Sequence, residues 1–299
     1  MSEQIIGIDH WWNQPLGRYL LAWEQTSYDD AVADVFGFQS LQLGCFPLQG
    51  LRCNRMPQRW LALQKQEHDL LQQLRDDVSL QTFAKGLPMA EGLHETHPLP
   101  LQAALLCCPQ ALPFAENSLD LVLLPHSLEW SDDPHAVLRE VARVLMPQGR
   151  VLISGINPAS LWGLRSWAGG RRWARPVAGL PPHGQLIGYG RLRDWLKLLD
   201  LELEAASFGC YRPALHSQPW LERYGWLDRI GAGGWPMLGG AYFVEAVKRV
   251  AGAHRLTVSW QGRRAAAVTR PAPATRAPSP GIYSYAPGSA DAFRRGADF

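Results

Sequence analysis

A strand–helix–strand pattern in the middle of the chain constrains its fold most strongly. Residues 118–124 are strongly apolar apart from Ser118 and Asp120, which predicts a strand buried on both faces. Asp133 and Pro134 then begin a helix, because aspartate is a favoured N-cap and proline fits the first helical position. After a turn at residues 147–149, residues 151–153 predict the next buried strand. Two buried strands joined by a helix indicate a parallel sheet covered by helices.

The flanking segments predict further helices and strands. Apolar residues at helical spacing indicate helices over residues 11–35, 59–75 and 192–199. Strands are expected over residues 40–43, 101–107, 201–208 and 241–247. The last two strands are joined by a long connection and indicate a hairpin-like addition at the end of the sheet. The alternation of strands and helices predicts a doubly wound α/β fold with helices on both faces of the sheet.

Charge and composition change near the end of the chain. From Arg255 onward there are seven arginines and two acids, whereas the preceding residues carry a small net negative charge. This end is rich in proline and alanine and has too little apolar surface to offset the entropy of ordering. We therefore expect an N-terminal helical segment at 1–38, a domain at 39–250 and a disordered basic tail at 251–299. We favour a solvated tail over one that binds nucleic acid.

The cysteines and the apolar segments indicate the cellular compartment in which the protein is expected. The five cysteines include no C-x-x-C pair, and no apolar stretch approaches the roughly 18–20 residues that span a bilayer. The chain begins without the basic and apolar segments of a signal peptide. We expect free thiols, a cytoplasmic protein and no membrane partner. We also expect no metal site, since the two acids near His126 are better explained as helix caps. The oligomeric state stays open.

Candidate binding residues follow three of the predicted strands, where open parallel sheets bind their ligands. Gly44 follows the first strand and lets the backbone turn tightly and approach a nucleotide. Cys107 and Cys108 end the strand before the central block, and His126 follows the strand at 118–124. Each also has a purely structural explanation. Gly44 fits an ordinary turn, the two cysteines fit small buried residues, and His126 fits a hydrogen-bonded structural histidine.

Three motifs follow one another between Ala111 and Gly155. They are ALPFAENSLDLV at residues 111–122, HSLEW at 126–130 and DPHAVLREVARVLMPQGR at 133–150. In this combination they resemble the LPF-x-x-x-S-F/L-D-x-V, H-x-L-E-H and D-P-x-x-x-L-R-E-x-x-R-V-L-K-P-G-G motifs of class I S-adenosylmethionine-dependent methyltransferases of the type 11-like kind. The wider chain resembles a proteobacterial branch of this superfamily whose methyl acceptor is unknown. The resemblance implies a mostly parallel, seven-stranded, Rossmann-like sheet.

The resemblance also implies a cofactor and the residues that bind it. S-adenosyl-L-methionine would lie against the loop after the first strand, the residues after the third strand and the end of the fourth strand. The implied cofactor-binding residues are Gly44, Cys45, Phe46, Cys108, Pro109, Leu112, Pro125 and His126. His126 is in addition the candidate catalytic residue, as a base or as an orienting group.

Two positions depart from the family pattern. The usual D-x-G-x-G-x-G loop is QLGCFPL at residues 42–48, without the acid and two of the glycines. Cys108 stands where an acidic residue would bind the adenine amino group, and a thiol is a weak acceptor. Two functions stay open: a methyltransferase of unknown acceptor, and a non-catalytic methyltransferase-like binding or regulatory module. A nicotinamide-dependent oxidoreductase is disfavoured, because the triple-glycine loop and the Tyr-x-x-x-Lys pair are absent.

Overall fold

The computed structural model describes residues 12, 14–65, 67–69, 104–164, 185–215 and 217–249. The strands are β1 Gln39–Leu43, β2 Gln58–Leu63, β3 Ala104–Leu106, β4 Leu119–Pro125, β5 Leu145–Ile156, β6 Leu201–Gly209 and β7 Ala241–Lys248. The helices are α2 Pro15–Ala33, α5 Pro134–Val144, α7 Tyr189–Leu198, α8 Gln218–Arg223 and α9 Trp226–Gly234, followed by the 3-10 helix η1 Pro236–Leu238.

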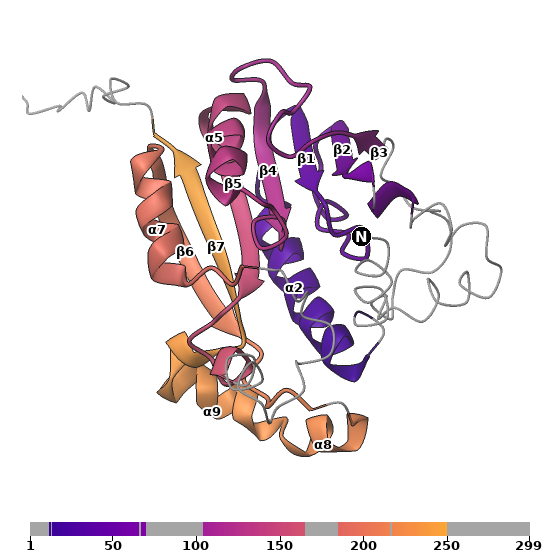
Figure 1. Cartoon of the computed structure of the whole chain (residues 1–299), viewed down its shortest axis with the longest axis vertical. Coiled ribbons are helices and arrows are strands. Elements are labelled where there is room, and N and C mark those ends of the chain that lie inside the picture. The colour runs from indigo at the N-terminus through magenta and orange to yellow at the C-terminus, as the bar shows by residue number, and fades with distance from the viewer. Residues whose placement is uncertain are drawn as a thin grey trace, which may run out of the picture. The chain divides into compact units, whose positions relative to one another are not determined.

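All seven strands form one sheet in the order β3-β2-β1-β4-β5-β7-β6 (Figure 1). The strands β1 to β5 pair in parallel, whereas β7 is antiparallel to both of its neighbours, β5 and β6. The mostly parallel, doubly wound sheet predicted from the sequence is therefore confirmed, and so is the hairpin-like addition formed by its last two strands.

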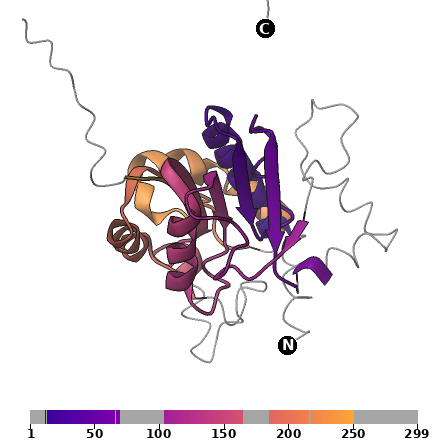
Figure 2. The ribbon, with the colours of Figure 1, turned by 90° about the horizontal axis from the view of Figure 1, so that it is seen from above.

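Helices cover both faces of this sheet (Figure 2). On one face, Leu20 and Tyr28 of α2 share a buried cluster with Leu121 of β4. On the other face, α5 and α7 share a second buried cluster with Val122. Successive residues of β4 thus face opposite sides, as the two-residue period of a strand requires. Burial on both faces explains why residues 118–124 are so uniformly apolar.

The helix predicted over residues 59–75 is wrong in its first part. Residues 58–63 form β2, which pairs with β1 on one side and with β3 on the other. Leu61, Ala62 and Leu63 are buried in succession, as in a parallel strand covered on both faces. A short apolar run does not distinguish such a strand from a helix by its period alone. Residues 70–75 lie outside the described part of the chain.

The turn predicted at residues 147–149 lies inside β5. The strand begins at Leu145, and its register with β4 shifts between Leu119 and Leu121. Gln148 has a φ of 67°, which is the left-handed conformation typical of a turn. The local bend is therefore present as an irregularity within a longer strand.

Several predictions concern residues outside the described part of the chain. The tail at 251–299 and residues 1–11 of the N-terminal segment are among them. The division into three parts at residues 38 and 250 stays a prediction. Among the described residues, no helix combines the length and the apolar character needed to cross a bilayer.

The last strand is bonded to the centre of the fold. The ammonium group of Lys248, at the end of β7, donates hydrogen bonds to the carbonyl oxygens of Ala142 and Leu145 at 2.6 and 2.8 Å. It also donates to Oδ1 of Asn117 at 2.8 Å. Because the last carbonyl groups of a helix have no partner within it, Lys248 completes the C-terminal end of α5.

The helix start predicted at Asp133 is confirmed and can be tested by stability. The Asp133 side chain accepts a hydrogen bond from the backbone N–H of Ala136 at 3.0 Å. We expect Asp133→Ala to lower the free energy of unfolding by about 1 kcal/mol, because the N-cap acceptor is lost. Asp133→Asn keeps an acceptor oxygen and should stay close to the parent chain. Chemical denaturation measures both, and equal losses in the two variants would contradict the cap.

Candidate functional site

The ends of three parallel strands converge on one edge of the sheet. Because β1, β4 and β5 run in parallel, Gly44, His126 and Asn157, which follow them, lie at their shared carboxyl edge. Open α/β sheets bind ligands at this edge. It is also where β7 begins, since Ala241 pairs with Ile156 in antiparallel register.

The loop after β1 is held by the buried side chain of Gln42. Its amide nitrogen donates to the carbonyl oxygens of Gly44, Cys45 and Leu48 at 3.2, 3.2 and 2.8 Å. Its amide oxygen accepts from the N–H of Gly50 at 3.0 Å. A carboxylate could not donate in this way, so glutamine at this position gives the loop a different set of bonds from an acid. Gly44 turns the backbone there with a φ of 72°.

Four of the predicted cofactor-binding residues line one small cavity at this edge: Gly44, Cys45, Pro109 and Pro125. The other lining residues are Leu43, Ala62, Gln64, Glu67, Ser127 and Trp130. The cavity volume is about 10 Å³, which is the space of one water molecule. The strand ends meet as the resemblance implies, but a nucleoside does not fit into this arrangement unless side chains move.

Glu67 fills the space above Gly44 and was not predicted from the sequence. One carboxylate oxygen accepts from the N–H of Cys45 at 3.1 Å, and the other accepts from the N–H of Gln64 at 3.2 Å. A Cβ atom on Gly44 would come within 3.3 Å of this carboxylate. Burial raises the pKa of Glu67 above its usual value. The one available signal was the position of this acid shortly after β2. The sequence predicted a helix over residues 59–75, so no strand end was expected near Glu67.

The remaining predicted cofactor-binding residues do not line this cavity. Phe46 is half-buried, and Cys108 is exposed in a short bridge with Ala111. Leu112 is buried in the core, and its N–H donates to Glu140 at 2.8 Å. The roles that the resemblance implies for these residues stay predictions.

His126 lies between two buried carboxylates. Its Nε2 atom is 2.8 Å from a carboxylate oxygen of Glu24, and its Nδ1 atom is 2.8 Å from one of Glu129. His126 has a φ of 54°, is buried and does not line the small cavity. The rings of Trp12 and Trp130 lie 5.5 and 6.3 Å from the imidazole, between ring centres.

The charge state of His126 follows from these neighbours. Burial alone would lower its pKa, but the carboxylates of Glu24 and Glu129 outweigh burial and raise the pKa to about 10. The raised pKa favours the protonated imidazole near neutral pH; Nδ1 is hydrogen-bonded to Glu129, whereas Nε2 lies 2.8 Å from Glu24 without the geometry of a hydrogen bond. A cation without a free lone pair does not act as a base, so the arrangement favours the orienting role. The catalytic assignment itself stays a prediction.

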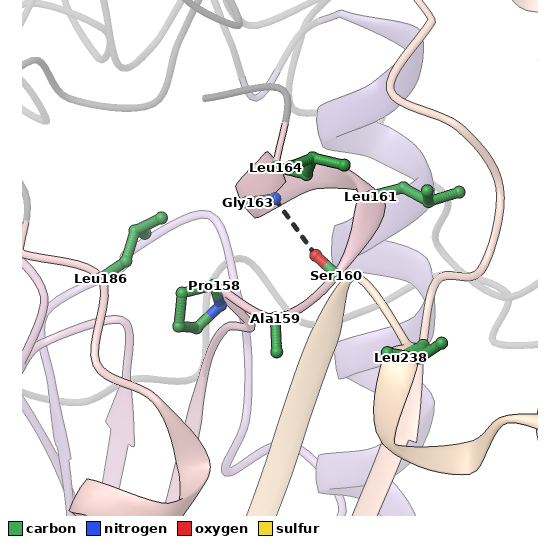
Figure 3. A pocket seen from close by; sticks show the side chains of 8 residues that line it. All are labelled: Pro158, Ala159, Ser160, Leu161, Gly163, Leu164, Leu186 and Leu238. Carbon is green, nitrogen blue, oxygen red and sulfur yellow. Dashed lines mark hydrogen bonds between the residues drawn. The ribbon is translucent and has the colours of Figure 1, made fainter. Parts of the chain in front are cut away.

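A second, larger cavity lies just beyond the end of β5. Its volume is about 540 Å³ (Figure 3). It is lined by Pro158, Ala159, Ser160, Leu161, Gly163, Leu164, Leu186 and Leu238. This cavity was not predicted from the sequence, because its walls come from three separate segments. In the described part of the chain, no cluster of three or more His, Cys, Asp or Glu side chains could hold a metal ion.

Comparison with known proteins finds similarity over the centre of the chain. Residues 78–153 match a family model described as a methyltransferase domain. The uncharacterized protein YafS of Escherichia coli is 38% identical over 141 residues, which cover 47% of this chain and 53% of that protein. A malonyl-[acyl-carrier protein] O-methyltransferase of Coxiella burnetii is 36% identical over 85 residues, 28% of this chain and 30% of that protein. The chain therefore spans about half or less of these curated relatives.

One solved structure matches the chain at low identity. It is a methyltransferase from Thermotoga maritima that is described as a possible histamine N-methyltransferase. It is 11% identical, with a TM-score of 0.46, and the match covers 81% of this chain and 94% of that one.

The buried histidine predicts a pH dependence of stability. Because its pKa rises from 6.5 to about 10 on folding, the stability that it contributes is complete below pH 6.5 and declines as the pH rises towards 10. We expect the free energy of unfolding to fall over this range in the parent chain and to fall less in His126→Gln. Urea denaturation from pH 6 to 10 measures the difference. His135→Gln, at an exposed histidine, should keep the parent slope, and equal slopes in all three chains would contradict the assignment.

Proposed function

We propose that the chain is a class I S-adenosylmethionine-dependent methyltransferase, which binds S-adenosylmethionine and transfers its methyl group to an acceptor; the match of residues 78–153 to a methyltransferase domain model supports this proposal. One observation carries this proposal. Gly44, Cys45, Pro109 and Pro125 come from separate strand ends and line the same cavity at the carboxyl edge of the sheet. The Coxiella relative is named for a malonyl-[acyl-carrier protein], but its match covers too little of that protein for its acceptor to be carried over.

The residues of this cavity fit the cofactor in their chemistry but not in the present volume. Gly44 leaves the backbone open to close approach, and the N–H of Cys45 is a donor at the mouth of the loop. Both are covered by Glu67. In the proposed complex, Glu67 leaves the Cys45 N–H, and the half-buried carboxylate becomes available to a ligand hydroxyl or amine.

When bound, S-adenosylmethionine supplies a methyl group on a positively charged sulfur, which is already a good electrophile. The chain then has mainly to hold and orient its partners. His126 and Glu129 fix the end of β4 against β5, because Glu129 also accepts from the N–H of Ile156 at 2.6 Å. Ser127 donates to the carbonyl oxygen of Leu43 and so ties the end of β4 to the loop after β1. These bonds keep the three strand ends in register.

Cofactor binding can be tested at Gly44. We expect S-adenosylmethionine and S-adenosylhomocysteine to raise the melting temperature with the logarithm of their concentration, since they bind the folded state. Gly44→Ala should weaken binding at least tenfold, because alanine disfavours a φ of 72° and its Cβ would crowd the loop. Gly190→Ala is the matched control, since a Cβ there meets nothing within 4 Å. A parent chain without any shift at millimolar cofactor would contradict the proposed function.

The exposed Cys108 offers a test of gain rather than loss. The resemblance places an acid at this position, and one charge-assisted hydrogen bond contributes about 1.5–3 kcal/mol. Cys108→Asp should therefore tighten cofactor binding by about ten- to a hundredfold, whereas Cys108→Ser, which adds no charge, should not. Isothermal titration calorimetry measures the three affinities. Unchanged binding in Cys108→Asp would place the adenine elsewhere.

A further inference from the structure

We propose that the 540 Å³ cavity beyond β5 binds an uncharged, apolar small molecule. If the chain transfers a methyl group as proposed above, the methyl acceptor comes from that chemical class. Four of the eight lining residues are leucines, and they surround the space drawn in Figure 3.

The position of the cavity favours a ligand over a packing defect. Six of its lining residues lie between positions 158 and 164, shortly after the end of β5, and Leu238 lies three residues before the start of β7. Since Ile156 pairs with Ala241, both walls stand at the carboxyl edge of the sheet, which is also the edge of the Gly44 loop. Ligands of open α/β sheets bind at this edge.

Glu129 links the cavity to the end of β4. Its carboxylate accepts from the N–H of Ile156 at 2.6 Å, and its backbone carbonyl accepts from the N–H of Gln185 at 3.1 Å. Gln185 precedes Leu186, which is a wall of the cavity. The residue after Glu129, Trp130, lines the small cavity beside Gly44. One short segment therefore lines the small cavity and is hydrogen-bonded to residues next to the walls of the large one.

The described walls of the cavity carry no charged side chain. Among the described lining residues there is no ionisable side chain, and Ser160 is the single hydroxyl. That hydroxyl donates to the carbonyl oxygen of Asn157 at 2.6 Å and accepts from the N–H groups of Trp162 and Gly163, each at 3.2 Å. Its hydrogen bonds are used within the protein. A charged molecule would lose its hydration here without a side-chain partner in return.

The size and exposure of the cavity suit a small molecule. Its volume lies within the roughly 300–1,000 Å³ of typical ligand pockets, whereas the cavity beside Gly44 holds about one water. Leu161, Leu164 and Leu238 are 57%, 58% and 49% exposed, so their apolar surface is partly in water. A ligand that covers them gains free energy by removing this surface from water.

The proposal can be tested with a neutral fluorescent probe. We expect N-phenyl-1-naphthylamine to bind the whole chain saturably without cofactor and to be displaced by 4-nonylphenol at least tenfold better than by 4-nonylbenzoate, which differs mainly by its charge. The double variant Leu161→Gln/Leu164→Gln should weaken probe binding at least tenfold. Both residues are more than half exposed, so the variant should fold, which circular dichroism checks. Leu198→Gln, at an 80% exposed leucine of α7, is the matched control.

The outcomes separate this inference from the proposed function. No saturable probe binding, equal displacement by the two competitors, or binding that the double variant leaves unchanged would each overturn the inference, even if S-adenosylmethionine binds. A concentration-dependent dimer that the double variant abolishes, without probe binding, would also overturn it. Probe binding with the expected charge preference, in a chain that fails to bind S-adenosylmethionine, would support the apolar site and remove the methyltransferase proposal.

Discussion

A buried cation between two carboxylates joins the layers of this fold. Glu24 belongs to α2, His126 follows β4, and Glu129 bonds onward to the end of β5. Removing such charges from water is costly unless each has a partner, so α2 and the two strand ends are held in one arrangement. Gly155 fits this requirement, because a Cβ there would come within 2.9 Å of the Glu129 carboxylate and within 2.5 Å of the Tyr242 hydroxyl.

The loop after β1 shows how side chains replace a glycine-rich backbone. From inside the protein, Gln42 bonds to three carbonyl groups and one N–H group of the loop, and Glu67 bonds to it from the outer side. The loop thus keeps a tight turn at Gly44 without the further glycines of the family pattern. The side chains of Gln42 and Glu67 set the shape of this loop. Access of the proposed cofactor therefore depends on Glu67 more than on the backbone.

The sequence predicted the features that depend on neighbouring residues. The Asp133 cap, the buried strand β4 and the following helix were correct, because capping and apolar runs act over a few residues. The prediction was wrong for β2, because a short apolar run fits a helix as well as a strand. For the same reason Glu67 was not recognised as a residue at a strand end. The sequence did not predict that Glu24 lies beside His126 or that Leu238 and Leu161 line one cavity. These residues are far apart in the chain, and the order of the strands in the sheet places them together. The sequence indicated His126 as a candidate residue, but it did not predict the raised pKa of its imidazole.

The place of β7 bears on how this chain can be made. β7 lies between β5 and β6, although it is synthesised after both, and Lys248 at its end completes the last turn of α5. While the chain grows on the ribosome, β5 is an open edge with unpaired backbone groups, which invites pairing with other chains. A fragment that ends before Ala241 would stay in that state. The stretch that matches the methyltransferase domain model lacks β1, β2, β6 and β7 and so contains only part of the sheet.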